Sequence, residues 1–315
     1  MNKDNNIILD IVYTYVDCND KKWLKQKKKD CSNNSICRYN SDLNEIKYSV
    51  YSVEKYFKNQ FRNIYFVTNN GKLPKCIKPK DNYIPILYSD LLGYRTYNST
   101  VIESCLHKIE GLSEYYLYFN DDFILMRKLK ISDFIEKDTG KLIWYKESNR
   151  LFNIALKYPS IASKFIKIFF YDIDNGCIES RDRIYEILNI KDKIDGQIGH
   201  NPHIYKKSMV KKICKKYKDE IIKNKNRVIR SDDDFPINDI FCFYYLKKNK
   251  IIFSNKYKTK ILIQLDNNFT SKILNRLDNS HFLCIEDTRQ INKIDNYVKH
   301  LLDKKFKKIK DIETI

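Results

Sequence analysis

The chain has 315 residues, and its 59 Lys and Arg side chains exceed its 40 Asp and Glu side chains by 19. This length suffices for one large domain or two ordinary ones, and a hydrophobic fraction of 43% excludes a chain that is disordered by composition. Its seven glycines and six prolines exclude a collagen-like or linker-rich protein, and no apolar stretch is long enough to cross a membrane.

The first part of the chain alternates between apolar strands and amphipathic helices. Residues 7–16 form an apolar, β-branched run that predicts a buried strand, and residues 21–38 predict a loop or a short exposed helix. Apolar side chains at helical spacing predict a helix over 43–57, with Asp42 and Glu45 as a capping box. Further predicted elements are strands at 63–68, 84–88 and 115–119, and a helix that begins at Asn98 or Ser99 and ends at Gly111.

This alternation predicts an α/β fold with a mostly parallel sheet flanked by helices. Residues 131–195 have a more helical and less regular pattern. We therefore expect a helical insert or lid at 131–195, between a first part of the core at 1–130 and its remainder at 196–315. Helices are also predicted at 205–225 and 291–306.

Within the insert, residues 151–171 are apolar with interspersed lysines. An ordinary packed helical segment is favoured there, and a lid or a basic helix lying on a membrane is the alternative. The N-terminus lacks the basic start and apolar run of a signal peptide, so we expect a cytoplasmic protein. The nine cysteines contain no C-x-x-C pair and are typical of buried free thiols in a reducing compartment.

The positive charge is spread along the chain and favours an anionic ligand or surface, although an AT-rich genome would also encode many lysines. Charge alone does not separate nucleic acid from nucleotide-sugars, acidic glycans or a membrane face. The phosphate-binding motifs G-x-G-x-x-G and G-x-x-x-x-G-K-[ST] are absent, which argues against a Rossmann dehydrogenase and a P-loop enzyme.

Acidic side chains follow two of the predicted strands. Asp17 comes after the first strand, and Asp121 and Asp122 come directly after the strand at 115–119. Ligands of open α/β sheets bind beyond the carboxyl ends of the strands. Paired carboxylates in that place can hold a divalent cation against a diphosphate, while ordinary turn residues are the alternative.

A second group of candidate residues lies in the C-terminal part. His200 begins the run H-N-P-H, and Arg227 and Arg230 follow about thirty residues later. A histidine can act as a general acid or base near neutral pH, and an arginine can clamp phosphate oxygens. Glu103, in the predicted helix before residue 111, is a further candidate acid. Surface or core positions remain the alternative for each of them.

Four blocks of the sequence, taken in order, resemble a known family. They are I-L-D-I-V-Y-T-Y-V-D at 8–17, the long block from Arg38 to F-N-D-D at 119–122, H-N-P-H at 200–203 with V-I-R at 228–230, and F-L-C-I-E-D at 282–287. The chain resembles the Stealth proteins, hexose-1-phosphate transferases that include bacterial capsule polysaccharide phosphotransferases. Tyr15, Cys18 and Glu286 depart from the usual Trp, Gly and Asn of the family pattern.

The resemblance implies a glycosyltransferase-A-like core that moves sugar-1-phosphate from a UDP-sugar to a glycan hydroxyl and releases UMP. It implies that Asp121 and Asp122 hold Mg²⁺ or Mn²⁺, and that Arg230 neutralises phosphate charge. His200 is the candidate for the base or for a phosphate contact, and Glu103 and Asp17 would orient the donor or the acceptor. The residues expected to bind the substrates are Tyr13, Thr14, Asn98, Asp20, Arg227 and Asp287.

Two alternatives stay open. The first is an ordinary metal-dependent glycosyltransferase, which would transfer the sugar and release UDP. The second is a basic nucleic-acid-binding protein, which requires a clustered basic face with stacking aromatic residues. The aromatic residues here fall in predicted strands and helices, so we expect no nucleic-acid partner. The expected partners are a nucleotide-sugar and a glycan, with peripheral association at the inner membrane face compatible with the charge.

Overall fold

The computed structural model describes residues 7–31, 44–147, 175–191, 197–231, 234–257, 259–262, 280–285, 299–300 and 302–306. The strands are β1 (Leu9–Tyr15), β2 (Ile64–Thr68), β3 (Tyr83–Leu87), β4 (Tyr115–Asn120), β5 (Phe123–Leu125), β6 (Leu142–Glu147), β7 (Gln197–Ile198), β8 (His203–Lys206), β9 (Ile251–Ser254), β10 (Thr259–Leu262) and β11 (Phe282–Ile285). The α-helices are α1 (Lys21–Asp30), α2 (Glu45–Tyr56), α3 (Tyr88–Leu92), α4 (Ser99–Cys105), α7 (Asn175–Ile187), α8 (Lys207–Lys216), α9 (Lys218–Lys225) and α10 (Ile237–Lys247). Two short 3₁₀ turns are η1 (Leu106–Lys108) and η2 (Ile131–Asp133).

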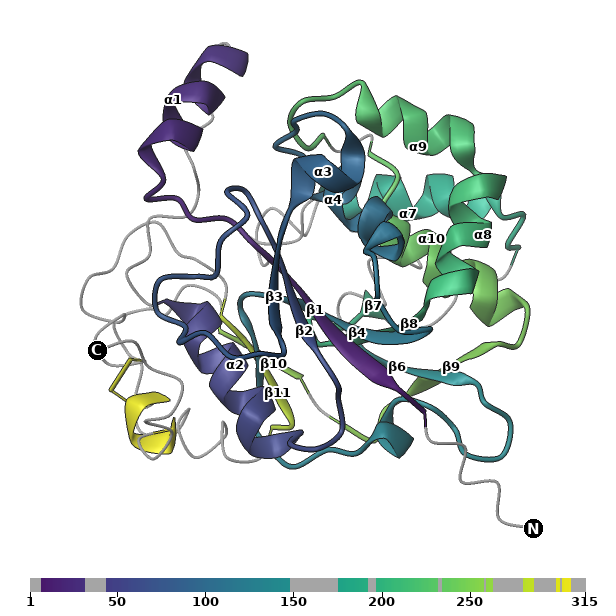
Figure 1. Cartoon of the computed structure of the whole chain (residues 1–315). Coiled ribbons are helices and arrows are strands. Elements are labelled where there is room, and N and C mark those ends of the chain that lie inside the picture. Colours follow the sequence, from purple (N-terminus) through teal and green to yellow (C-terminus); the bar gives the residue numbers. More distant parts are fainter. Residues whose placement is uncertain are drawn as a thin grey trace, which may run out of the picture.

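The largest sheet has five strands in the order β3-β2-β1-β4-β8. The first four are parallel and β8 is antiparallel to β4, with helices packed around the sheet (Figure 1). The predicted α/β fold with a mostly parallel, helix-flanked sheet is therefore confirmed. From β1 the chain adds β2 and β3 on one side and then returns to add β4 on the other. This reversal creates a topological switch point between β1 and β4, where such sheets bind ligands.

Most of the elements expected in the first part of the chain are present with small shifts. The basic segment after β1 is a helix, α1, rather than a loop, and α2 and β2 to β4 occupy the predicted places. Asn98 is the N-cap of α4, because its Oδ1 accepts the N–H of Thr100 at 3.0 Å. Gly111 adopts a positive φ of 72° after η1, as expected for a helix stop. Asp42, of the predicted capping box, and residues 151–171 lie outside the described residues.

Segment 131–195, for which the sequence predicts a helical insert, contains the strand β6. β6 pairs in parallel with β9, with Leu142 opposite Ile251, and antiparallel with β7. A run of bulky apolar residues suits a helix or a strand equally until its pairing partner is known. Here the partner lies more than a hundred residues downstream, so the local pattern did not reveal the strand. β8 was also missed, at the start of the segment predicted as the helix 205–225.

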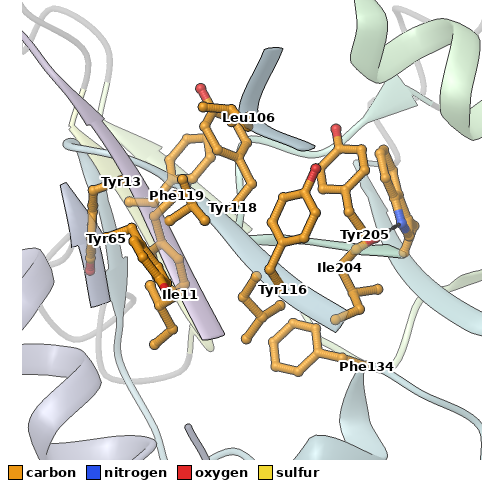
Figure 2. Close-up of a cluster of buried hydrophobic side chains, with 14 of the residues drawn as sticks. Ile11, Tyr13, Tyr65, Leu106, Tyr116, Tyr118, Phe119, Phe134, Ile204 and Tyr205 are labelled. Atoms are coloured by element: carbon orange, nitrogen blue, oxygen red, sulfur yellow. Dashed lines mark hydrogen bonds between the residues drawn. The ribbon is translucent and has the colours of Figure 1, made fainter. Parts of the chain in front are cut away.

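The hydrophobic core around β4, β6 and β8 is rich in tyrosine (Figure 2). Tyr116 of β4 and Tyr205 of β8 stack with ring centroids 5.4 Å apart. Trp144 of β6 donates its indole N–H to the carbonyl of Ile204 at 2.9 Å. Buried Tyr and Trp side chains combine a large apolar surface with a polar group that needs a partner. The core therefore fixes how β4, β6 and β8 lie relative to one another.

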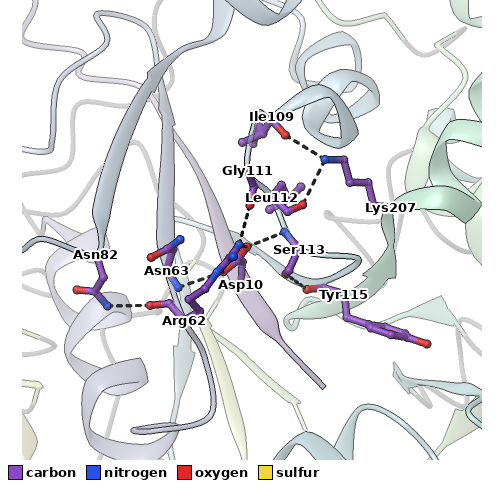
Figure 3. Close-up of polar contacts among 10 residues, drawn as sticks. All are labelled: Asp10, Arg62, Asn63, Asn82, Ile109, Gly111, Leu112, Ser113, Tyr115 and Lys207. Atoms are coloured by element: carbon purple, nitrogen blue, oxygen red, sulfur yellow. Dashed lines mark hydrogen bonds and ion pairs between the residues drawn. The ribbon is translucent and has the colours of Figure 1, made fainter. Parts of the chain in front are cut away.

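One buried carboxylate links the central strands at the amino-terminal edge of the sheet (Figure 3). Asp10 of β1 is 0% exposed. It accepts hydrogen bonds from the Arg62 guanidinium at 2.7 and 3.1 Å and from the backbone N–H groups of Asn63 at 3.1 Å and Ser113 at 2.7 Å. Asn63 and Ser113 lie just before β2 and β4, so Asp10 links the three central strands at the edge opposite the switch point.

Replacing Asp10 with alanine is expected to lower the free energy of unfolding by about 2–4 kcal/mol. The substitution leaves two half-buried N–H donors without an acceptor and removes the carboxylate that pairs with Arg62. Urea denaturation of the purified protein measures the change. Asp138→Ala, in an exposed turn, is the matched control and should shift the free energy by less than about 0.5 kcal/mol. Equal stability of the two variants would show that Asp10 does not hold the strands together.

Within the described residues, no helix combines the length and the apolar character needed to span a bilayer.

Candidate active site

Polar residues gather where the three central strands end. Asp17 follows β1, Asn69 follows β2, and Asp121 follows β4. The strands are in register, with Tyr15 opposite Thr68 and Thr14 opposite Asn120. The residues that follow these pairs therefore lie at the same edge of the sheet, at the switch point between β1 and β4.

Asp17 is held in place on both sides of its backbone. Its N–H donates to Asn69 Oδ1 at 2.9 Å, and its carbonyl accepts the Asn69 side-chain amide at 3.2 Å. Its carboxylate accepts the N–H of Asn19 at 2.9 Å and lies 3.6 Å from the Lys75 ammonium group. Asp17 is 8% exposed, and these contacts position its side chain before any substrate arrives.

Asp121 and Asp122 form the turn between β4 and β5. Burial, followed by the negative charge of Asp122 and then that of Glu45, raises the pKa of Asp121 well above its usual range. Asp122 is tied to β11, because its Oδ2 accepts the Cys284 thiol at 3.2 Å and its carbonyl accepts the N–H of Ile285 at 3.2 Å. Two adjacent carboxylates thus sit at the switch point, and their mutual repulsion favours a positive charge beside them.

This pair suits Mg²⁺ or Mn²⁺ only together with a substrate. Across the described residues, no group of three or more His, Cys, Asp or Glu side chains could hold a metal ion by itself. Mg²⁺ commonly takes one or two carboxylates from the protein and completes its oxygen shell with phosphates and water. The hard oxygen donors of Asp121 and Asp122 fit that kind of site.

Glu103 of α4 belongs to a polar network beneath the same edge. Its Oε2 accepts the side-chain amide of Asn238 at 3.0 Å, and it is hydrogen bonded to Tyr118 of β4. The Tyr118 hydroxyl also lies 3.0 Å from Thr14 Oγ1 of β1. Asn238, at the start of α10, in turn accepts a hydrogen bond from the Tyr205 hydroxyl. The network therefore joins β1 and β4 to α4 and α10.

The surroundings of Glu103 control its ionisation. Burial raises the pKa of Glu103 to about 7, although the Arg230 charge and hydrogen bonds from Tyr118 and Asn238 partly oppose the shift. Burial also raises the pKa of Asp239 to about 6, against the charges of Arg181 and Arg230. Carboxyl groups that titrate near neutral pH in a polar cluster are typical of functional sites.

Arg230 reaches this cluster because the segment after α9 is pinned to the segment before α4. The N–H of Tyr97 donates to the carbonyl of Val228 at 2.8 Å, and Tyr97 forms a parallel β-bridge with Ile229. Arg230 itself is exposed. Its positive charge opposes the rise in the pKa of both Glu103 and Asp239, so the guanidinium lies near these carboxyl groups. Because it is also exposed, it can bind an anionic ligand that enters from solvent.

The two histidines of the H-N-P-H run have different environments. His203 is buried in β8, stacks on Trp144 with centroids 4.4 Å apart, and makes a hydrogen bond with the carbonyl of Gly199 at 2.9 Å. Its pKa is lowered to about 4 by burial, so it is a neutral core residue. His200 is exposed and precedes β8. Because β8 runs antiparallel to β4, with His203 opposite Tyr118, His200 lies toward the carboxyl edge of β4.

Two of the residues expected to contact substrate make structural contacts within the fold. Tyr13 is 0% exposed, packs between Phe66 and Phe119, and is hydrogen bonded to Ser49 at 2.9 Å, so its expected place in the pocket lining is not supported. Asn98 is also 0% exposed, and besides capping α4 it donates to Asp234 at 2.6 Å.

Of the other residues expected to bind substrate, Arg227 and Asp20 make structural contacts, and Thr14 lies beside the Glu103 network. Arg227 forms a salt bridge with the buried Asp234 at 3.1 Å, which anchors the segment that carries Arg230. Asp20 caps α1 by accepting the N–H groups of Lys22 and Trp23. Thr14 is half-buried at the end of β1 and contacts the Glu103 network through Tyr118. Asp287 lies outside the described residues.

Three residues of the cluster were not identified from the sequence. Tyr118 has the pattern of a core strand residue, and Asn238 and Asp239 begin a helix with a polar turn. The only local signal is the polar pair directly after Pro236 and Ile237, and ordinary helix starts look the same.

Comparisons with known proteins point to one family. A family model described as Stealth protein CR2, conserved region 2, matches residues 38–143. The capsular polysaccharide phosphotransferase fcs1 of Haemophilus influenzae is 29% identical over 260 residues, which cover 78% of this chain and 68% of the relative. The capsular polysaccharide phosphotransferase eps5J of Streptococcus thermophilus is 30% identical over 182 residues, which cover 52% of this chain and 69% of the relative.

A further relative is matched over less of its own length. The exopolysaccharide phosphotransferase SCO6023 of Streptomyces coelicolor is 26% identical over 77% of this chain but only 40% of its own length. Among solved structures, the galactosyltransferase LgtC in complex with donor and acceptor sugar analogs covers 97% of both chains, at 10% identity and a TM-score of 0.49.

Proposed function

Because the chain belongs to the Stealth family, we propose that it transfers sugar-1-phosphate from a nucleotide-sugar, a UDP-sugar in the first instance, to a hydroxyl of a glycan. The related proteins named above as capsular and exopolysaccharide phosphotransferases support transfer of a phosphate-containing group to a polysaccharide. The nucleotide, the sugar and the acceptor are part of the proposal.

In the proposed reaction, the acceptor oxygen attacks the phosphorus atom next to the sugar. A new P–O bond forms to the acceptor, the P–O bond to the nucleoside monophosphate breaks, and UMP leaves. The acceptor hydroxyl gives its proton to a base. Such a transfer depends on alignment of the reacting oxygens and on neutralisation of phosphate charge more than on covalent chemistry by the protein.

The described residues offer a group for each of these needs. Arg230 would neutralise charge on the diphosphate, and Asp17 and Glu103 would orient hydroxyl groups of the donor or the acceptor. His200 would accept the acceptor proton or contact a phosphate oxygen. Asp121 and Asp122 would hold Mg²⁺ or Mn²⁺, which supplies positive charge at the phosphate oxygens when it is bound.

One observation carries the proposal. Two adjacent carboxylates, Asp121 and Asp122, lie at the switch point of the sheet. Glu103 lies beneath the same edge, and the charge of the exposed Arg230 opposes the rise in its pKa. This arrangement suits a diphosphate donor. The carboxylates can hold a cation against its phosphate oxygens, and the guanidinium can neutralise phosphate charge directly.

Identification of the released nucleotide tests the proposed function. The purified protein is incubated with UDP-N-acetylglucosamine and related UDP-sugars, a sugar acceptor, and Mg²⁺ or Mn²⁺, and the nucleotide is identified by mass. UMP together with a phosphodiester product is expected, and chelation of the metal should abolish the reaction. UDP as the released nucleotide would instead place the protein among ordinary metal-dependent glycosyltransferases, for which the same carboxylate pair would serve.

A further inference from the structure

Helix α1 leaves the body of the protein directly beside the candidate active site. It begins at Lys21, four residues after Asp17 at the end of β1, and projects away from the sheet (Figure 1). A ligand that extends out of the switch point past Asp17 therefore meets α1 next.

Contacts near both ends of α1 define its orientation. At the start, Asp20 caps the helix and accepts the side-chain amide of Asn70 at 3.3 Å, which ties it to the loop after β2. Trp23 is 9% exposed and packs edge-on against Tyr97 at 5.5 Å. At the end, the Tyr97 hydroxyl donates to Asp30 at 2.6 Å. One side of α1 is thus fixed to the segment that precedes α4.

The opposite side of α1 carries a stripe of lysines. At about 100° per residue, the positions of five exposed lysines fall within an arc of about 120°, roughly opposite Trp23 and Asp30. These five, called the α1 lysine stripe below, are Lys21, Lys22, Lys25, Lys28 and Lys29. Lys27 lies outside the stripe and sits over the rings of Trp23 and Tyr97. A coding bias toward lysine would not by itself sort the charges onto one side of a helix.

The stripe is open to an anionic ligand. None of its five ammonium groups forms a salt bridge with a carboxylate among the residues that the structure describes. The two acidic residues at the ends of α1, Asp20 and Asp30, accept hydrogen bonds from other groups. From Lys21 to Lys29 the helix rises by about 12 Å, which is longer than one phosphate group needs.

The chemistry of the stripe favours a polyanion in solution over a membrane surface. Helices that bind in a membrane interface bury large apolar side chains in it. The exposed large apolar residues of the described chain are Ile8, Ile187, Ile222, Val228 and Ile229, and none belongs to α1. The stripe therefore offers charge without an apolar anchor.

We propose that the α1 lysine stripe binds the anionic part of the acceptor, a glycan chain that already carries phosphodiester links. This inference rests on the proposed function, in which each transfer adds one negatively charged phosphodiester to the product. A product that is extended again becomes a polyanionic acceptor. Its reactive end would lie at the switch point, and its earlier phosphodiesters would lie along α1.

The test compares two variants with the same loss of charge. The stripe variant replaces Lys21, Lys22, Lys25, Lys28 and Lys29 with glutamine. The matched control replaces five exposed lysines of α8 and α9, namely Lys211, Lys212, Lys215, Lys218 and Lys223, with glutamine. The probe is a glycan of sugars linked by phosphodiesters, with a neutral glycan of the same sugar and length as reference. Binding is measured without donor, at low and at physiological salt.

The stripe variant should bind the phosphodiester glycan at least about 10-fold more weakly than the wild type, with a smaller dependence on salt. The control should lose less than about 3-fold, and transfer to a short neutral acceptor should be unchanged in both variants. Equal losses in the two variants would overturn the proposal, as would tighter binding of anionic lipid vesicles or single-stranded RNA than of the glycan.

The outcomes also separate this inference from the proposed function. A protein that releases UDP or transfers nothing fails the proposed function, whatever it binds. A protein that transfers sugar-1-phosphate while its stripe variant uses the phosphodiester glycan as well as the wild type does fails only the inference about α1.

Discussion

Replacing Asp121 with asparagine is expected to lower sugar-1-phosphate transfer at least about 100-fold while the protein stays folded. Asp121 follows β4 at the switch point, where a diphosphate would lie. Its pKa is raised well above the usual range by burial and by the charges of Asp122 and Glu45. A carboxylate in such surroundings is unfavourable for the folded protein alone, and the cation of the proposed reaction would offset this cost.

The same reasoning predicts that Asp121→Asn keeps or slightly raises the melting temperature. Initial rates at saturating donor and a thermal unfolding curve check both halves. Asp138→Asn, in the exposed turn before β6, is the matched control and should change neither. More than a tenth of the wild-type rate in Asp121→Asn would contradict the role of this carboxylate in transfer.

Replacing Glu103 with glutamine is expected to lower activity at least about 10-fold and to make the protein more stable at pH 8. Glutamine keeps an oxygen that can accept the amide of Asn238 but removes the charge. If transfer needs the carboxylate, wild-type activity rises with pH through about 7, the pKa of Glu103, and the variant loses this contribution to the profile.

The direction of the stability change follows from the raised pKa. Below the ordinary pKa of 4.5, Glu103 is protonated in the folded and the unfolded chain, and it adds no pH dependence. Between 4.5 and about 7 the unfolded chain loses this proton while the folded protein keeps it, so wild-type stability falls as pH rises. The penalty is complete above about pH 7, where Glu103→Gln avoids it.

Urea denaturation of both proteins at pH 5 and pH 8 measures this difference. Glu110→Gln, at an exposed position near η1, serves as the control and should behave as the wild type does. A stability gap between wild type and Glu103→Gln that does not widen with pH would show that burial does not raise the pKa of Glu103.

The elements that local patterns specify were predictable from the sequence. The runs that became β1, β2 and β4 are mostly apolar because parallel strands are covered on both faces. Their order along the chain, with helices between them, also predicted the parallel sheet. The acidic turns after β1 and β4 could be placed at one edge, because parallel strands end on the same side.

Two features could not be predicted from the sequence: which face of the sheet carries the site, and which residues far apart in the sequence contact each other. Along β1, successive side chains point to opposite faces, so Thr14 contacts Tyr118 while Tyr13 contacts Ser49 of α2. A strand that is buried on both faces gives no sign of which face carries the site. The Asn238–Glu103 hydrogen bond joins residues 135 positions apart, and no local pattern encodes such a contact.

The most direct test of the proposed function follows the phosphorus atom attached to the sugar. A UDP-sugar that carries radioactive phosphorus only in that position is incubated with the protein, Mg²⁺ and a glycan acceptor, and the products are separated. Transfer of sugar-1-phosphate moves the label into the glycan and leaves unlabelled UMP. Label recovered in UDP, with an unlabelled glycan product, would contradict the proposed function and show that the bond broken is the one between the sugar and its phosphate.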